Sequence, residues 1–185
     1  MAESISMTGV LSGDQIRAML EHEPPLIAGY ANVDDQIQPN GFDLTLADVS
    51  RHRGPGTIGI TNEQRVLPDL DPLPSDADGY FSLAPGIYHA IFTETVALPR
   101  SLMALGRARS SLNRSGVTIH TAVWDAGYAG RSTALLSVLN PEGFRVQRGA
   151  RILQLVFFGL GRPTDSGYRG LYQGENMPSG EGAHG

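Results

Sequence analysis

The sequence predicts one mostly β domain, a barrel or distorted jelly-roll sheet with a single short helix near its amino terminus. The chain has 185 residues, of which 41% are hydrophobic and 18% charged, so it can bury a sizeable core. Its 23 glycines and 12 prolines separate short runs rich in β-branched and aromatic residues. Helical periodicity is confined to one segment near the start. Short strands, regular turns and little helix are typical of β barrels and jelly rolls.

The single helix is expected at about residues 13–22. Ser12 and Gln15 form a capping-box pattern, and apolar residues follow them at helical spacing. The pair Pro24-Pro25 cannot continue a helix, so it ends the segment.

The expected strands are the short β-branched and aromatic runs that lie between turn signals. The strongest candidates are Ile87–Leu98, Val117–Ala122, Thr133–Leu139 and Arg151–Phe158, and the weaker ones are Phe42–Leu46 and Phe81–Leu83. Residues 51–80 are expected to form a long loop outside the sheet. The β domain is expected to cover residues 1–162, followed by a flexible Gly-rich tail at 163–185. The end of that tail, MPSGEGAHG, is expected to be disordered without ligand.

Composition excludes several classes of function. The chain has no cysteine, which excludes disulfides, thiolate nucleophiles, Cys-rich zinc sites and the zinc-deaminase signature. His22, His52 and His89 show no metal-ligand spacing, so no protein-bound zinc site is expected. No apolar run approaches the ~20 residues of a membrane span, and the first residues lack a signal pattern. We therefore expect a soluble cytoplasmic protein that does not bind a membrane.

The basic residues are concentrated in one part of an acidic chain. All 14 are arginine, and eight lie between Arg100 and Arg151, against the two acids Asp125 and Glu142. This segment carries +6 and the remainder −11, which gives the net charge of −5. A local cationic region on an acidic protein favours a compact polyanion such as a nucleotide triphosphate and argues against nucleic acid. The alternative is that individual arginines bridge subunits or lie on solvated strand faces.

The stretch Gly106–Gly116, GRARSSLNRSG, contains three arginines, three hydroxyl side chains and two glycines. Guanidinium and hydroxyl groups are suitable donors to phosphate oxygens. The spacing is not that of a P-loop. A polar turn between two strands accounts for this composition equally well.

A lone carboxylate, Asp125, stands at the end of the run Val117–Trp124 and begins a glycine-bearing turn. In that place a carboxylate can hold and deprotonate a water that faces a ligand, and Tyr128 can offer its ring to a sugar or base. The ordinary alternative is that Asp125 caps the turn and Tyr128 is a plain strand residue. His120, in the same run, is interpreted as a core or interface histidine.

Two further segments carry polar groups in unusual places. Gln154 interrupts the apolar run RILQLVFF, so its amide must find hydrogen bonds within the protein or with a ligand. The tail segment YRGLYQGE, residues 168–175, can close over a ligand and exclude water. The alternative for this segment is a disordered chain end.

Together these stretches resemble the dUTPase and dCTP deaminase superfamily of deoxynucleotide-triphosphate enzymes. LSGDQIRAML and QIQPNGFDLTL are similar to the deaminase-type amino terminus. LAPGIYHAIFTETVALP, GRARSSLNRSGV, the Asp125 turn, RGARILQLVFF and YRGLYQGE follow in the family order, so the resemblance covers most of residues 10–175. It implies a dUTPase-like, jelly-roll or β-clip subunit in a homotrimer whose active sites are shared between neighbours.

Position 135 separates the two activities of this superfamily. In the deaminase pattern a catalytic Glu stands ten residues after the Asp of the turn, and here that residue is Leu135. Leucine cannot carry the proton that deamination of cytosine requires, and Glu142, expected in a turn, is a poor substitute. The remaining pattern of Asp125, Tyr128 and Gly130 resembles the third motif of the trimeric dUTPases. One carboxylate is sufficient there, because Mg²⁺ and arginines take up the phosphate charge.

The resemblance therefore implies a dUTP diphosphatase that forms dUMP and pyrophosphate, with Mg²⁺ held mainly by the triphosphate. It assigns Asp125 to the orientation and deprotonation of the attacking water, with Asp43 supporting the site. The implied substrate-binding residues are Arg109, Ser110, Ser111, Arg114, Tyr128, Gln154, Tyr168, Tyr172 and Gln173. The chain departs from the dUTPase pattern at Ala129, where Arg is frequent, and in its tail, which is similar to the deaminase type.

Two other interpretations stay open at the level of sequence. A dCTP deaminase, or a bifunctional enzyme that takes dCTP to dUMP, would release ammonia from dCTP. A non-catalytic β trimer with a regulatory role would bind nucleotide without turnover.

Overall fold

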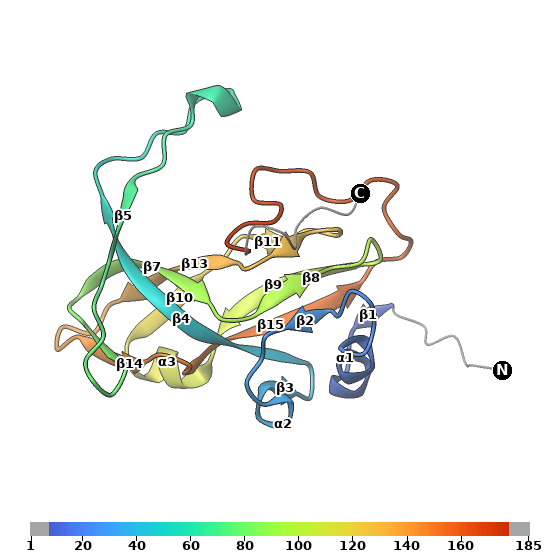
Figure 1. The fold of residues 1–185 in the computed structure, drawn as a ribbon, viewed down its shortest axis with the longest axis horizontal. Helices are drawn as coiled ribbons and strands as arrows, with labels where there is room; N and C mark the ends of the chain where they lie inside the picture. The colour runs from blue at the N-terminus through green and yellow to red at the C-terminus, as the bar shows by residue number, and fades with distance from the viewer. Residues whose placement is uncertain (1–7, 178–185) are drawn as a thin grey trace.

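A curled antiparallel sheet forms the body of the protein in a computed structural model that describes residues 8–177 (Figure 1). Its main strands follow the order β10-β13-β7-β4-β15-β9-β11, and each neighbouring pair is antiparallel. In chain order they are β4 (Gly41–Arg53), β7 (Gly86–Phe92), β9 (Leu102–Ala108), β10 (Val117–His120), β11 (Val123–Trp124), β13 (Thr133–Val138) and β15 (Arg151–Gly159). Three short strands pair at the margins: β1 (Gly9–Val10), β3 (Ile37–Gln38) and β5 (Asp69–Pro72). The mostly β fold expected from the sequence is confirmed.

Two small sheets complete the β structure. One contains β2 (Ile27–Ala28), β8 (Thr95–Ala97) and β12 (Ala129–Gly130), and the other pairs β6 (Tyr80–Leu83) with β14 (Phe144–Gln147). The first of these holds the turn that follows Asp125, because β12 pairs with β8.

The expected amino-terminal helix is present as α1 (Gly13–Met19). Its capping box is formed as the sequence indicates: Ser12 Oγ accepts from the Gln15 N–H, and Gln15 Oε1 accepts from the Ser12 N–H. The expectation of a single helix is wrong. Three further helical segments, each of five residues or fewer, are α2 (Val33–Gln36), the 3-10 helix η1 (Asn62–Gln64) and α3 (Ser110–Arg114). Segments this short show no helical periodicity in sequence. No helix among residues 8–177 is long and apolar enough to cross a membrane.

The predicted strands are present, with differences in extent. The run Ile87–Leu98 is divided into β7 and β8, because Glu94 turns into the interior between them. The weak candidate at Phe42–Leu46 is part of the 13-residue strand β4. Strand β9 was not predicted, since its sequence LMALGRA has no β-branched residue. Its flanking partners β15 and β11 make it a strand.

Residues 51–80, expected as a loop, contain a two-stranded hairpin. β4 continues to Arg53 and pairs with β5 from Ser50–Pro72 to Arg53–Asp69. A further bridge joins Thr57 and Val66, and η1 forms the tip. This hairpin projects from the body of the protein (Figure 1). Of the tail end expected to be disordered, residues 178–185 lie outside the described residues.

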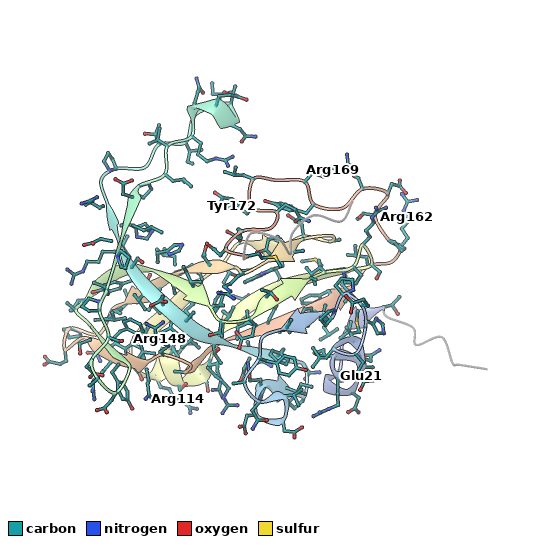
Figure 2. All side chains as sticks on the ribbon, viewed as in Figure 1. Glu21, Arg114, Arg148, Arg162, Arg169 and Tyr172 are labelled. Atoms are coloured by element: carbon teal, nitrogen blue, oxygen red, sulfur yellow. The ribbon has the colours of Figure 1, made fainter. Side chains whose placement is uncertain are left out.

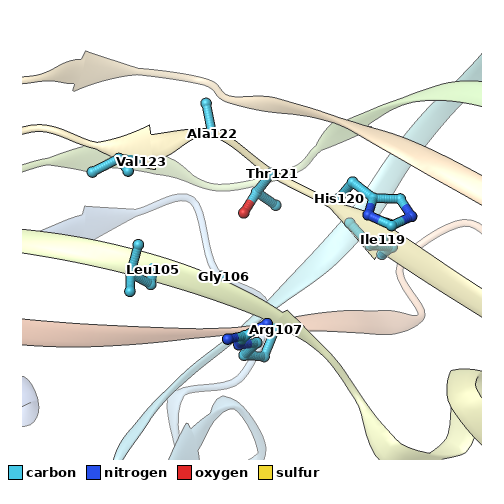
Figure 3. Close-up of a pocket in the computed structure, with 8 residues that line it drawn as sticks. All are labelled: Leu105, Gly106, Arg107, Ile119, His120, Thr121, Ala122 and Val123. Atoms are coloured by element: carbon cyan, nitrogen blue, oxygen red, sulfur yellow. The ribbon is translucent and has the colours of Figure 1, made fainter.

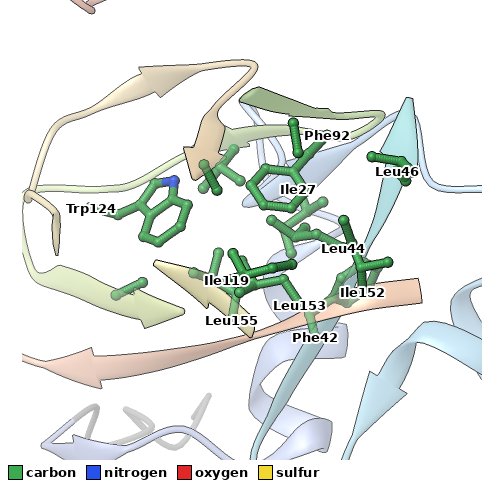
Figure 4. Close-up of a cluster of buried hydrophobic side chains, with 14 of the residues drawn as sticks. Ile27, Phe42, Leu44, Leu46, Phe92, Ile119, Trp124, Ile152, Leu153 and Leu155 are labelled. Atoms are coloured by element: carbon green, nitrogen blue, oxygen red, sulfur yellow. The ribbon is translucent and has the colours of Figure 1, made fainter. Parts of the chain in front are cut away.

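The core lies on the inner face of the curled sheet (Figure 4). Along β13, Ala134, Leu136 and Val138 are buried in it, so Leu135 points outward. The largest fully buried side chains are Phe42, Phe81, Phe92 and Phe157. This alternation leaves the outer face of the sheet free to carry polar groups, and several candidate site residues lie there.

Candidate active site

Asp43, Gln154 and Arg107 form one row across three neighbouring strands. Gln154 on β15 is the Cα partner of Asp43 on β4 and of Arg107 on β9. Partnered residues of a sheet point to the same face, and the inner face here carries Leu153 and Leu155. The three polar side chains therefore share the outer face. Gln154 therefore lies on the outer face of the sheet, and its amide is not part of the buried core.

Gly41 makes room for the Gln154 side chain. A Cβ atom at position 41 would lie 3.0 Å from Gln154 Cγ and Nε2, and 2.6 Å from the carbonyl oxygen of Leu155. Any larger residue would displace the amide from its position on the outer face.

Asp43 holds two arginines beside this row. Its side chain is buried, with Oδ2 3.1 Å from Arg109 Nε and 3.6 Å from Arg151 Nη1. These are ion-pair distances, although no N–H points at Oδ2 with hydrogen-bond geometry. Burial raises the pKa of Asp43, and the two guanidinium groups partly offset that rise. Asp43 thus positions cationic groups; it is too enclosed to act on a ligand directly.

A second buried carboxylate fixes the strand that carries Asp43. Glu94 is fully buried and accepts hydrogen bonds from Thr45 N–H (2.9 Å), Thr45 Oγ1 (2.8 Å) and Gln36 Nε2 (2.6 Å). The same Gln36 Nε2 donates to the Asp43 carbonyl at 2.9 Å. Burial raises the pKa of Glu94, and these donors oppose the rise. Sequence reasoning missed Glu94, although an acid within the apolar run AIFTETVAL is a usable signal.

The arginine- and serine-rich stretch forms α3, which follows β9 directly. Arg109 is its N-cap residue, Leu112 is buried, and Ser110, Ser111 and Arg114 are exposed (Figure 2). The polar turn considered from composition is therefore a one-turn helix. Its exposed donors lie at the end of the strand that carries Arg107.

Arg107 was not among the predicted site residues. It is exposed and lines a cleft of about 230 Å³ between β9 and the segment from Ile119 to Val123 (Figure 3). His120 lines the opposite wall and is exposed, so of the two expected positions the core is wrong and an interface position stays a prediction. The alternation of Arg107 with Arg109 in GRAR is the sequence signal that was available.

Asp125 stands at the mouth of the turn that follows β11. Its carbonyl accepts from the Tyr128 N–H at 3.0 Å, which closes the turn through the backbone. The Asp125 side chain is exposed, and within residues 8–177 no hydrogen bond or ion pair engages its carboxylate. The side chain does not cap the turn, so the ordinary structural explanation for an acid at this position does not apply.

The turn itself is tightly built. Gly127 has a φ of +86°, and a Cβ atom there would lie 2.6 Å from the Cα of Gly167. Glycine is the residue that accommodates both the positive φ and the close contact with Gly167. The carboxylate therefore projects from a rigid support.

Tyr128 is buried beneath the tail. Its hydroxyl lies 2.8 Å from Ser132 Oγ and donates to Glu175 Oε1 at 2.9 Å. Ser132 Oγ also accepts from Trp124 Nε1 at 2.6 Å. The ring of Tyr168 packs edge-on against Tyr128, with centroids 5.8 Å apart. Burial raises the pKa of Tyr128, so its hydroxyl stays a neutral donor.

The tail runs along the Asp125 turn and along β12, which is an edge strand of its sheet. Gln173 pairs with them through both amide atoms: Oε1 accepts from Ala129 N–H and Nε2 donates to the Gly127 carbonyl, each at 3.1 Å. Backbone bonds add Tyr168 N–H to the Ala126 carbonyl (2.8 Å), Gly174 N–H to the Ala129 carbonyl (2.8 Å) and Arg131 N–H to the Glu175 carbonyl (2.9 Å). Tyr172 remains exposed on the outside of the tail (Figure 2). The tail and the Asp125 turn with β12 thus form one hydrogen-bonded unit.

We predict that docking of the tail strengthens as the pH falls. Burial raises the pKa of Glu175 in the docked tail, and the Tyr128 hydrogen bond only partly opposes this. A raised pKa means that the docked tail binds the Glu175 proton more tightly than the undocked tail does. The resulting stabilisation of docking is complete below the pKa of Glu175 in the undocked tail, and it is lost as the pH rises through the pKa of Glu175 in the docked tail. Hydrogen exchange at the Arg131 amide, corrected for its intrinsic pH dependence, should show greater protection at low pH. Glu175→Gln should remove the trend; protection that increases with pH would contradict it.

The predicted site residues form two separate clusters in one chain. One contains Asp43, Gln154 and the α3 donors, and the other contains Asp125 and Tyr128 with the tail. Because β11 pairs with β9 at Trp124–Ala104, Asp125 follows at the level of Met103. Met103 is four residues from Arg107 along β9, on the order of 13 Å. The cleft between the clusters is also smaller than the ~300 Å³ at which ligand pockets begin.

Leu135 lies on the outer face of β13, where its Cα partners are His120 on β10 and His89 on β7. Strand β13 carries no acid. Glu142 stands in the exposed turn after it, where its N–H donates to Asn140 Oδ1. No carboxylate therefore takes the place of Leu135 on this strand.

Comparison with known proteins identifies similar chains. Residues 10–160 match the family model described as dCTP deaminase-like. A chain from Methanosarcina mazei, named probable deoxyuridine 5′-triphosphate nucleotidohydrolase, is 44% identical over 90% of this chain and 98% of its own length. A chain of the same name from Archaeoglobus fulgidus is 46% identical over 92% of this chain and 99% of its own.

Among solved structures, the 2′-deoxycytidine 5′-triphosphate deaminase of Agrobacterium tumefaciens is similar, with a TM-score of 0.61 and 27% identity. The match covers 82% of this chain and 48% of that one, so this chain spans about half the length of the Agrobacterium protein.

Proposed function

The chain belongs to the dCTP deaminase-like family, and from this premise we propose that it is a dUTP diphosphatase, which hydrolyses dUTP to dUMP and pyrophosphate. The observation that carries the proposal is the free, exposed carboxylate of Asp125 at the mouth of a rigid turn, with Leu135 on a strand that has no acid. The names of the relatives at 44–46% identity support the same activity.

In this proposal Asp125 accepts a proton from a water molecule held at the turn. The water oxygen then attacks the α-phosphorus, and the bond from that phosphorus to the bridging oxygen breaks. Pyrophosphate leaves with the electron pair of that bond, and dUMP keeps the new oxygen. A positioned carboxylate acting as general base typically contributes 10²–10⁴-fold to the rate.

The first of the two clusters, the one that contains Asp43, Gln154 and the α3 donors, is here called the cationic cluster, and in this proposal it binds the triphosphate. Arg109, Ser110, Ser111 and Arg114 offer guanidinium and hydroxyl donors on and beside α3, and Gln154 and Arg107 continue them along the outer face. Asp43 keeps Arg109 in place through the 3.1 Å contact. Arginine forks match phosphate oxygens in geometry as well as charge.

Magnesium is expected to come with the nucleotide. Among residues 8–177 no group of three or more His, Cys, Asp or Glu side chains is placed to hold a metal ion. We propose that the ion is chelated by the triphosphate itself. When bound, it would neutralise charge on the phosphate oxygens. The residues of the chain bind the remaining phosphate oxygens.

We also propose that the active unit is a homotrimer with shared sites, located in the cytoplasm. Asp125 and the α3 donors are on the order of 13 Å or more apart along one chain. A reacting group must approach to about 3–3.5 Å, and this backbone separation is much larger, which favours a site that takes the two clusters from different subunits. A site assembled from the Asp125 turn of one subunit and the cationic cluster of its neighbour would bring both to one nucleotide.

Product analysis tests the proposal. The purified protein is incubated with Mg²⁺ and, in parallel, with dUTP and dCTP, and pyrophosphate and ammonia are measured. We expect pyrophosphate and dUMP from dUTP and no ammonia from dCTP. Ammonia from dCTP would assign deaminase activity despite Leu135, and binding without either product would assign a regulatory role.

A further inference from the structure

Arg131 carries a guanidinium group that the described part of the chain leaves without an acceptor. Its Nε atom is buried and has no hydrogen-bond partner. Among residues 8–177, no acid lies within ion-pair distance of Arg131. Leaving a buried donor unpaired is costly, and more so for a charged group, which points to an acceptor that comes from outside the chain.

The other arginines of the basic segment 100–151 do not share this environment. Those with partners in the chain are Arg100, Arg109, Arg145, Arg148 and Arg151. Arg107 and Arg114 are exposed, so water solvates their charges. Within the described residues, Arg131 is therefore the arginine of this segment whose guanidinium is partly withdrawn from water and still unpaired.

The backbone of Arg131 is fixed on both sides by the tail. Its N–H donates to the Glu175 carbonyl at 2.9 Å, and its carbonyl accepts from Asn176 Nδ2 at 2.9 Å. These bonds do not involve the side chain. The guanidinium is therefore presented from a restrained position, and less conformational freedom is lost when it binds an anion than on a mobile loop.

Arg131 and Asp125 lie at the two ends of the short segment that contains the Asp125 turn and β12. Asp125 directly follows Trp124, and Arg131 directly precedes Ser132. Trp124 and Ser132 are both buried, and they are joined by the 2.6 Å bond from Trp124 Nε1 to Ser132 Oγ. Asp125 is exposed and Arg131 is partly exposed. The free carboxylate and the unpaired guanidinium of the described chain thus belong to the same turn.

We propose that Arg131 binds the α-phosphate of the nucleotide and, during hydrolysis, stabilises the negative charge that develops on its non-bridging oxygens. This inference rests on the proposed function, in which water held by Asp125 attacks that phosphorus. A cation that is already in position where charge develops lowers the barrier, and the planar guanidinium can donate to two phosphate oxygens at once. Arg131 keeps its protons: the proton of the water still goes to Asp125, and pyrophosphate leaves as described above.

Binding of dUMP and of deoxyuridine tests the phosphate contact without turnover. The two ligands differ only in the phosphate, and NMR titration measures both affinities for the wild type and for Arg131→Gln. We expect the substitution to weaken dUMP binding about tenfold or more and to leave deoxyuridine binding unchanged. Arg131→Lys should recover part of the loss, because an ammonium group keeps the charge but not the fork.

Arg162→Gln is the matched control, because Arg162 is exposed and belongs to neither cluster (Figure 2). It should bind dUMP as the wild type does. Circular dichroism and light scattering compare the fold and the subunit mass of all the variants. A change of subunit mass in Arg131→Gln would assign Arg131 to a contact between subunits and overturn the inference.

Steady-state kinetics with dUTP tests the charge stabilisation. Arg131→Gln should lower kcat by about 10²–10³-fold, the loss typical when one donor to a developing oxyanion is removed. An unchanged kcat, or dUMP binding that is equal in Arg131→Gln and the wild type or no tighter than deoxyuridine binding, would overturn the inference and leave the proposed function standing. A wild type that does not hydrolyse dUTP, but whose dUMP binding depends on Arg131, would contradict the proposed function and leave the phosphate contact standing.

Discussion

Asp125→Asn is expected to lower kcat for dUTP hydrolysis by about 10²–10⁴-fold, the contribution typical of a general base. The amide has nearly the same shape as the carboxylate but cannot accept the proton of the attacking water. Since no other described side chain bonds to the Asp125 carboxylate, the substitution should leave the fold, the subunit mass and the KM almost unchanged. Steady-state kinetics with a pyrophosphate assay, together with light scattering, measure all three quantities.

Asp14→Asn is the matched control, because Asp14 is an exposed acid in the first turn of α1, a helix that carries none of the candidate site residues. It should leave kcat unchanged. If Asp125→Asn kept more than about a tenth of the wild-type rate, Asp125 would not be the base, since that loss is below the range for general-base catalysis.

Glu94→Gln is expected to produce the largest loss of stability among isosteric substitutions in this protein. The carboxylate accepts from Thr45 N–H, Thr45 Oγ1 and Gln36 Nε2. A glutamine must turn its NH₂ group toward at least one of these donors, which leaves buried donors without an acceptor. Each such donor costs roughly 1–3 kcal/mol in the free energy of unfolding. Urea unfolding followed by circular dichroism measures the loss.

Glu142→Gln provides the comparison, because Glu142 lies in an exposed turn. Its effect should be within about 0.5 kcal/mol, as for most surface substitutions. Equal stability of Glu94→Gln and the wild type would mean that the buried carboxyl is already neutral and that the donors find other acceptors.

Local pattern and family resemblance were sufficient for much of the fold. The capping residues Ser12 and Gln15 located α1, and β-branched runs located β7, β10, β13 and β15. β9 could not be identified in this way, because LMALGRA becomes a strand only through pairing with β15 and β11. The hairpin formed by the end of β4 with β5 was expected as a loop, since its pairing depends on the continuation of β4 past the domain body.

Sequence patterns indicated most of the candidate site residues, which stay predictions, but not Arg107, Glu94 or the arrangement of the site. The turn pattern identified Asp125 and Tyr128, and the GRARSS stretch identified the α3 donors. Cross-strand register, which places Arg107 beside Gln154, is a tertiary property, as is the burial of Glu94 against Thr45. The distance between the two clusters follows from the register of β9 and β11. It cannot be predicted from the sequence pattern of either strand alone.

The central claim is that water primed by Asp125 attacks the α-phosphorus of dUTP. Hydrolysis of dUTP in ¹⁸O-enriched water, followed by mass spectrometry of both products, tests it most directly. The account predicts one heavy oxygen in each dUMP formed and none in pyrophosphate. Heavy oxygen in pyrophosphate, with unlabelled dUMP, would place the attack on the β-phosphorus and contradict the claim.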